Sequence, residues 1–80
     1  MDPITFYTKP GCHLCEDGQW LLEVALRGRP IDVNYVDITS DPVLTQQYGD
    51  QIPVLSQPAV STELAWPFTP ESILAWLDGI

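Results

Sequence analysis

The chain has 80 residues, of which 45% are hydrophobic and 18% are charged, a composition that predicts one folded domain over residues 1–80. Three basic residues against eleven acidic ones give a net charge of -8, which argues against binding to nucleic acid or to an anionic membrane surface. No apolar run approaches the roughly 20 residues that span a bilayer. The first residues also lack the pattern of a signal peptide, so we expect a cytoplasmic protein, and a monomer.

The first third of the chain predicts a strand followed by a helix. Ile4–Thr8 is a short β-prone run that ends at a Lys-Pro-Gly turn. Residues 12–27 follow with helical spacing, and Gly28 with Pro30 marks their end. Gly18 costs about 1 kcal/mol relative to alanine inside a helix, so we expect close packing there. The apolar stripe of this helix is expected to contain Leu14, Leu21, Leu22 and Ala25.

A second strand and a short helix are expected next. Residues 31–36 alternate between apolar and polar side chains, as a half-buried strand does. Asp41 followed by Pro42 is typical of a helix cap with proline at the first helical position. The short helix is expected to end near Tyr48, before Gly49.

The last third predicts two strands and a final helix. Residues 52–55 and 59–64 are β-prone runs, and Thr69 with Pro70 repeats the signature of a capped helix that ends at Gly79. The expected order is therefore β-α-β-α-β-β-α. Two parallel strands joined by a helix and followed by a hairpin predict a single sheet with helices on both faces, which is an α/β fold.

The two cysteines, Cys12 and Cys15, lie in one C-x-x-C motif, which is typical of a redox pair or of half a metal site. A bridge across this spacing closes a small loop and adds little to stability. A structural zinc requires four ligands, and only His13 adds to the cysteines, with Cys12 and His13 pointing apart on a helix. We expect no metal site within one chain, although an iron–sulfur cluster shared by two chains stays open.

The position of Cys12 at the start of a helix predicts a reactive thiol. Free N–H groups and the positive end of the helix dipole favour a thiolate there. Lys9 and His13 are the nearby positive groups that would support it, although each is equally compatible with a solvated surface residue. Cys15 follows three residues later, so its side chain is expected beside Cys12 and nearer the core.

These residues predict thiol–disulfide exchange. The Cys12 thiolate would attack a substrate disulfide, and Cys15 would then displace the substrate thiol from the mixed disulfide. A separate reductant would regenerate the dithiol. The alternative is a non-catalytic binding module whose cysteines have no redox partner.

The chain resembles the small bacterial glutaredoxin-like proteins of the thioredoxin-fold superfamily. The resemblance rests on Lys9-Pro10-Gly11-Cys12-His13-Leu14-Cys15 after a strand, on Ile52-Pro53-Val54-Leu55, and on Trp66-Pro67-Phe68. It implies a thioredoxin-like fold with a central four-stranded mixed sheet, and a thiol–disulfide oxidoreductase with no bound cofactor. The partners that it implies are a protein or small-molecule disulfide, and glutathione or a thioredoxin reductase-like protein as reductant.

The resemblance also implies a cis proline at Pro53, with the backbone of Ile52 offered to an extended substrate. The residues alone instead favour a trans proline on an edge strand. Two segments depart from the glutaredoxin pattern. His13-Leu14 replaces the usual Pro-Tyr between the cysteines, which puts the redox potential in doubt, and Trp66-Pro67-Phe68 stands where glutaredoxins place two glycines against glutathione.

Overall fold

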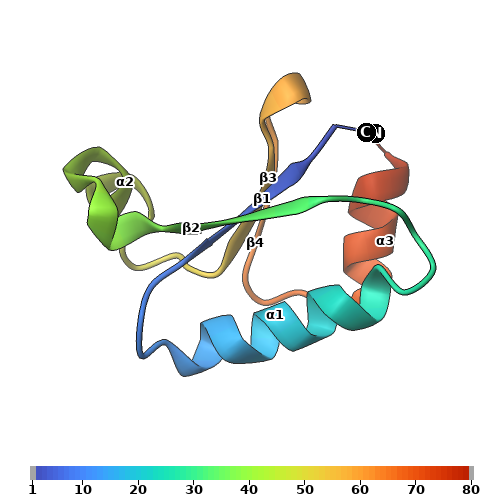
Figure 1. The fold of residues 1–80 in the computed structure, drawn as a ribbon, viewed down its shortest axis with the longest axis horizontal. Coiled ribbons are helices and arrows are strands. Elements are labelled where there is room, and N and C mark those ends of the chain that lie inside the picture. The colour runs from blue at the N-terminus through green and yellow to red at the C-terminus, as the bar shows by residue number, and fades with distance from the viewer. Residues whose placement is uncertain (1, 80) are drawn as a thin grey trace.

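Four strands form one mixed sheet in the order β2-β1-β3-β4 in the computed structural model, which describes residues 2–79 (Figure 1). β1 pairs in parallel with β2 and antiparallel with β3, and β3 pairs antiparallel with β4. The predicted element order and mixed sheet are therefore confirmed. The strands are β1 (Ile4–Thr8), β2 (Val33–Asp37), β3 (Val54–Gln57) and β4 (Thr62–Ala65).

The helices begin where the sequence places its cap residues. The Asp41 carboxylate accepts the Val43 N–H at 2.8 Å, and Thr69 exchanges hydrogen bonds with Ser72 in a capping box. Both helices carry proline in their first turn, as predicted. The α-helices are α1 (His13–Ala25), α2 (Pro42–Tyr48) and α3 (Pro70–Asp78). Of two 3₁₀ turns, η1 (Ile38–Ser40) lies between β2 and α2, and η2 (Pro58–Val60) lies between β3 and β4.

α1 and α3 cover the same face of the sheet. The register pairs Phe6 with Tyr35, so both point to this face, and their ring centroids are 5.5 Å apart. The indole Nε1 of Trp76 in α3 donates to Thr62 Oγ1 on the same face at 3.3 Å. α1 packs against α3, and Figure 1 shows the two helices side by side.

α2 covers the opposite face, so helices lie on both sides as predicted. Tyr7 follows Phe6 in β1 and therefore points away from α1. Its ring stacks on Tyr48 of α2 with centroids 4.3 Å apart, and the Tyr48 hydroxyl donates to the Glu63 carboxylate in β4. Burial, together with this hydrogen bond, raises the pKa of Tyr48. No local pattern in the sequence predicts this contact between Tyr48 and Glu63.

The core lies between the sheet and the pair of helices on the α1 side. Its fully buried side chains come from strands and helices alike, among them Ile4, Phe6, Leu22, Leu55, Ile73 and Leu77. One predicted core position is wrong, because Leu14 is 48% exposed. The buried face of α1 instead contains Cys15, Gly18, Leu22 and Ala25. The stripe is therefore rotated so that Cys15, and not Leu14, starts it.

Three strands start later than the sequence predicts. β2 starts at Val33 and β3 at Val54, each two residues later than expected, while β4 starts at Thr62 after the η2 turn. η2 takes up residues 58–60, part of which the sequence predicts as strand, and Ser61 ends it with a left-handed φ of 52°. None of the helices within residues 2–79 is both long and apolar enough to cross a membrane.

Candidate redox site

Cys12 and Cys15 form a disulfide at the amino end of α1. Cys12 is the N-cap residue, with extended backbone angles, and the two Cα atoms are 5.2 Å apart. The Cys15 N–H donates to Cys12 Sγ at 3.1 Å. The Cys12 sulfur therefore occupies the place where a capping side chain receives a free N–H group, close to the positive end of the helix dipole.

The two sulfurs differ in their access to solvent. Cys15 is 3% exposed and belongs to the hydrophobic core, whereas Cys12 is partly exposed and packs against the core from outside. The sequence predicts this difference. A partner disulfide can therefore approach Cys12 from solvent, while Cys15 can reach it only from the protein side.

A sharp turn positions Cys12 directly after β1. The turn places Gly11 at a φ of 73°, a left-handed conformation that glycine adopts without steric cost. Thr8 ends β1 and His13 starts α1, so only four residues separate the sheet from the helix. The carboxyl end of a central strand is thereby connected directly to the amino end of α1, which carries the disulfide.

Lys9 and His13 are both exposed, at the two sides of this turn. Nδ1 of His13 lies 3.5 Å from Glu16 Oε2, with 96% of the His13 side chain exposed. Within residues 2–79, no carboxylate lies within 4.0 Å of the Lys9 ammonium. Lys9 thus precedes the turn and His13 follows Cys12 directly, with the His13 ring directed toward Glu16.

Pro53 is packed against α1 one turn beyond Cys15. The Ile52–Pro53 peptide bond is cis, and the Pro53 side chain is fully buried. A Cβ placed on Gly18 would lie 2.9 Å from Pro53 Cγ and 3.3 Å from Phe68 Cζ. The contact explains the glycine within the helix, because a larger residue would displace the segment that carries Pro53.

The backbone around Pro53 divides into a paired and an unpaired part. The Trp66 N–H donates to the Pro53 carbonyl at 3.1 Å, which continues the β3–β4 pairing. The N–H and carbonyl of Ile52 take part in none of the loop and turn hydrogen bonds of residues 2–79. Main-chain groups of Ile52 therefore have no such hydrogen-bond partner within these residues, and the residue as a whole is buried.

Two aromatic rings, those of Trp66 and Phe68, complete this side of the site. Phe68 is 4% exposed and partly buried Trp66 packs against it edge-on, with ring centroids 5.1 Å apart. The Trp66–Pro67 peptide bond is also cis. What sequence reasoning missed is the contact of Phe68 with Gly18, for which the internal glycine was the available signal.

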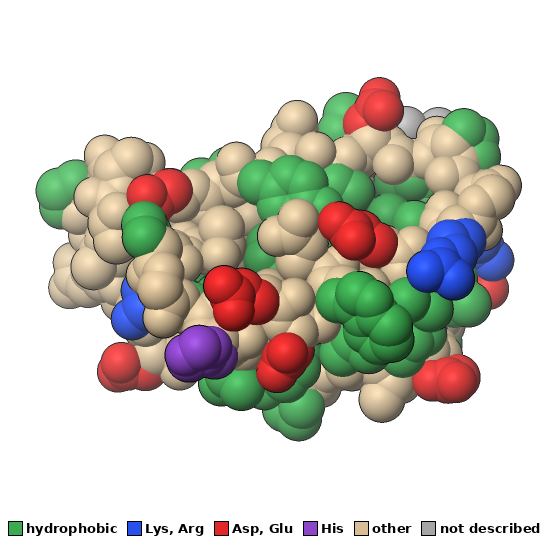
Figure 2. Space-filling model, turned by 60° about the horizontal axis from the view of Figure 1, so that its bottom comes forward, with side chains coloured by type: hydrophobic (Ala, Val, Ile, Leu, Met, Phe, Trp, Pro, Cys, Tyr) green, Lys and Arg blue, Asp and Glu red, His purple; other side chains and the backbone are tan. Residues whose placement is uncertain are grey.

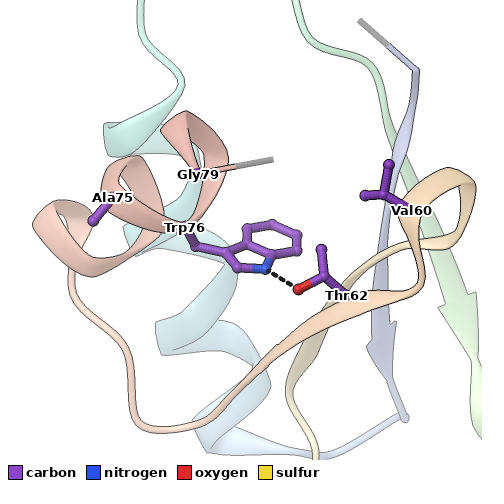
Figure 3. Close-up of a pocket in the computed structure, with 5 residues that line it drawn as sticks. All are labelled: Val60, Thr62, Ala75, Trp76 and Gly79. Atoms are coloured by element: carbon purple, nitrogen blue, oxygen red, sulfur yellow. Dashed lines mark hydrogen bonds between the residues drawn. The ribbon is translucent and has the colours of Figure 1, made fainter.

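The residues that the structure describes contain no metal-binding cluster, and one pocket lies away from the cysteines. Among residues 2–79 no group of three or more His, Cys, Asp or Glu side chains is arranged to hold a metal ion. A pocket of about 370 Å³ lies between η2, β4 and α3. Figure 3 shows the indole of Trp76 among the residues that line it, hydrogen-bonded to Thr62. The pocket contains neither cysteine, so it is separate from the disulfide.

Comparison with known proteins identifies the family. A family model described as Glutaredoxin-like domain (DUF836) matches residues 3–78. The chain belongs to the glutaredoxin-like domain family. A protein from X. campestris, solved by X-ray crystallography, is 36% identical, with a TM-score of 0.85 and coverage of 96% of this chain and 97% of that one. No match was found among curated proteins.

More distant structures show that this glutaredoxin-like domain has a thioredoxin-like fold. A Nitrosomonas europaea protein solved by NMR is 28% identical, with a TM-score of 0.76 over 92% of this chain and 88% of that one. Thioredoxin 1 from Thermosipho africanus is 14% identical, with a TM-score of 0.71 over 96% and 91%. At that identity the likeness shows the fold alone, and it confirms the predicted thioredoxin-like architecture.

Proposed function

We propose that this glutaredoxin-like protein is a thiol–disulfide oxidoreductase that cycles between the Cys12–Cys15 disulfide and the dithiol. The observation that carries the proposal is the position of Cys12. Its sulfur is partly exposed, caps α1 and accepts the Cys15 N–H at 3.1 Å. A donor and a dipole that stabilise negative charge favour the thiolate, which is the nucleophilic form of cysteine.

The exchange proceeds in two balanced steps. In the reduced protein the Cys12 thiolate attacks one sulfur of a substrate disulfide, forming a mixed disulfide and releasing the first substrate thiolate. Cys15, deprotonated, then attacks Cys12 Sγ, which forms the intramolecular disulfide and releases the second thiolate. The substrate gains two electrons and the protein loses two. A thiol reductant, glutathione or a thioredoxin reductase-like protein, restores the dithiol.

The segment that contains Ile52 and Pro53 supports substrate binding. The unpaired N–H and carbonyl of Ile52 can pair with an extended peptide, as in strand addition. Pro53 packs on Gly18, one turn from Cys15, so this backbone is held near the sulfurs. Lys9 remains exposed beside the turn and is available to a carboxylate of the substrate or of glutathione.

The reduction potential of the cysteine pair tests this proposal. We expect reversible equilibration with a series of glutathione buffers and a potential of roughly -180 to -270 mV, the range of catalytic dithiols. Mass spectrometry of a Cys15→Ser variant should detect any mixed disulfide on Cys12. A pair that resists reduction, with a potential below about -300 mV as structural disulfides have, would contradict catalysis. Iron and colour in anaerobically purified protein would instead favour a cluster carrier.

A further inference from the structure

The solvent side of α1 carries an exposed indole among carboxylates. Trp20 is 60% exposed and lies opposite the buried face of the helix that contains Cys15 and Leu22. Glu16 precedes it by four residues and Glu23 follows it by three, so both are its neighbours on the helix surface. Asp17 precedes Trp20 by three residues and is therefore also its neighbour on the helix surface. Neither packing nor the proposed exchange chemistry uses this tryptophan.

A second exposed aromatic extends the same surface onto the sheet. Tyr35 in β2 is 47% exposed, although its ring also contacts Phe6. Partial burial, and then the nearby Glu23 carboxylate, raise the pKa of Tyr35. Gln19 donates to Glu23 Oε1 at 3.3 Å, which holds this carboxylate on the helix surface.

Together these residues form what we call the acidic–aromatic face: Glu16, Asp17, Trp20, Glu23 and Tyr35. Figure 2, which looks onto the α1 side, shows hydrophobic patches near the middle of this surface with acidic side chains between and beside them.

Few cations neutralise the acidic–aromatic face. His13 lies 3.5 Å from Glu16 and carries charge only when protonated. Arg27 follows Glu23 by one turn, but no carboxylate within residues 2–79 lies within 4.0 Å of its guanidinium, and Arg29 pairs with Asp78. Three carboxylates therefore face solvent around the indole in a chain whose net charge is already -8.

We propose that the acidic–aromatic face docks a Lys/Arg-containing segment of the protein whose disulfide reacts at Cys12. This inference rests on the proposed function and specifies its partner as a basic protein. A guanidinium or ammonium group stacks favourably on Trp20 while the carboxylates beside it supply the opposite charge. Cys12 caps the same helix, and Trp20 lies eight residues further on, about 12 Å along the axis. One partner can thus reach both.

Binding can be tested without any redox chemistry. The oxidised protein is titrated with a cysteine-free peptide rich in Lys and Arg, and with a matched peptide in which these residues are Glu, while NMR follows the indole N–H signals. We expect the Trp20 signal to shift only with the basic peptide and at low salt, because salt screens surface charges. Trp20→Ala should weaken binding about two- to fivefold. Equal shifts with both peptides, or none, would overturn the proposal.

Kinetics then link the face to exchange. The triple variant Glu16→Gln, Asp17→Asn, Glu23→Gln should lower kcat/KM for a disulfide in the basic peptide by roughly tenfold at low salt, because steering is lost. Its matched control neutralises three exposed carboxylates elsewhere, Asp2→Asn, Asp32→Asn and Asp50→Asn, and should change this rate far less. If kcat/KM falls equally in both variants, the effect comes from the net charge of the protein, and the proposed docking face is contradicted.

A small uncharged disulfide separates the two proposals. The rate with the basic peptide is therefore divided by the rate with this uncharged disulfide, which cancels any effect of Glu16 on the Cys12 thiolate. This ratio should fall in the Glu16→Gln, Asp17→Asn, Glu23→Gln variant and stay unchanged in the control variant. If no disulfide is reduced at all, the proposed function fails, while the NMR titration still reports on docking. If the uncharged disulfide is reduced but basic and acidic peptides react equally, docking fails and the oxidoreductase stands.

Discussion

Replacing Cys12 by serine is expected to abolish disulfide reduction completely. Serine keeps a capping oxygen at the start of α1, where the Cys15 N–H now donates to sulfur, so the helix should remain intact. Serine has no thiol, and its hydroxyl group is not ionised near neutral pH, so the nucleophile is lost. Turnover of a model disulfide such as insulin, measured with a chemical reductant, should fall to the rate without protein.

The matched control for this variant is Cys15→Ser, which keeps the exposed sulfur. It should still form a mixed disulfide with the substrate, and that species should accumulate because no second thiol resolves it. Circular dichroism of both variants checks that the fold is retained. Normal turnover by the Cys12→Ser variant would end the oxidoreductase account, whatever the fold.

Replacing Gly18 by alanine is expected to destabilise the protein although alanine is the better helix former. The added Cβ would lie 2.9 Å from Cγ of the buried Pro53 ring, which has little freedom to move. Overpacking of this kind costs about 1–3 kcal/mol, against a helix-propensity gain of about 1 kcal/mol. Each net kcal/mol lost should lower Tm by about 4–8 °C for a domain of this size.

Two further variants show whether the Gly18→Ala effect comes from the contact with Pro53. Gly18→Val should be more severe than alanine, and it should also lower the exchange rate because it moves the Pro53 segment away from its place beside α1. Gln19→Ala, at an exposed position on the same helix, should change stability by no more than about 0.5 kcal/mol. A Gly18→Ala variant that is more stable than wild type would show that the Gly18–Pro53 contact is loose.

Much of the fold is predictable because turn and cap residues separate the elements. Asp41 and Thr69 each precede a proline and each caps a helix, and the Gly11 turn separates β1 from α1. These are local signals, and local signals are what a sequence shows most directly. The order of the elements then restricts the sheet to few topologies.

The errors come from interactions that distant residues decide. The sequence predicts Leu14 on the buried face of α1, but that face begins at Cys15. The spacing of apolar residues alone does not distinguish two positions that are one residue apart. β2 starts at Val33 because that residue pairs with Ile4, the first residue of β1. β3 starts at Val54, which pairs with Tyr7, because the preceding Pro53 has no N–H to donate to a strand partner. The local sequence pattern of a strand does not show which residues of β1 it pairs with.

Part of the candidate site is likewise predictable from local sequence, and part depends on contacts between distant residues. The C-x-x-C motif at a helix start identifies Cys12 and Cys15 from the sequence, because helix geometry fixes their relation. The packing of Pro53 on Gly18 joins residues 35 positions apart, and the bond from the Trp66 N–H to the Pro53 carbonyl joins residues 13 positions apart. Only the folded chain brings these segments together. The internal glycine was the one trace of this contact in the sequence.

The thiol pKa of Cys12 in the reduced protein is the measurement that tests the account most directly. Thiolate absorbance in the ultraviolet and the rate of alkylation, both against pH, should place it clearly below the value of about 8.5 for free cysteine. In the Cys12→Ser variant, buried Cys15 should titrate at or above that value and alkylate slowly. If Cys12 titrates at an ordinary value and reacts no faster than free cysteine, the start of α1 does not activate it, and the central claim is contradicted.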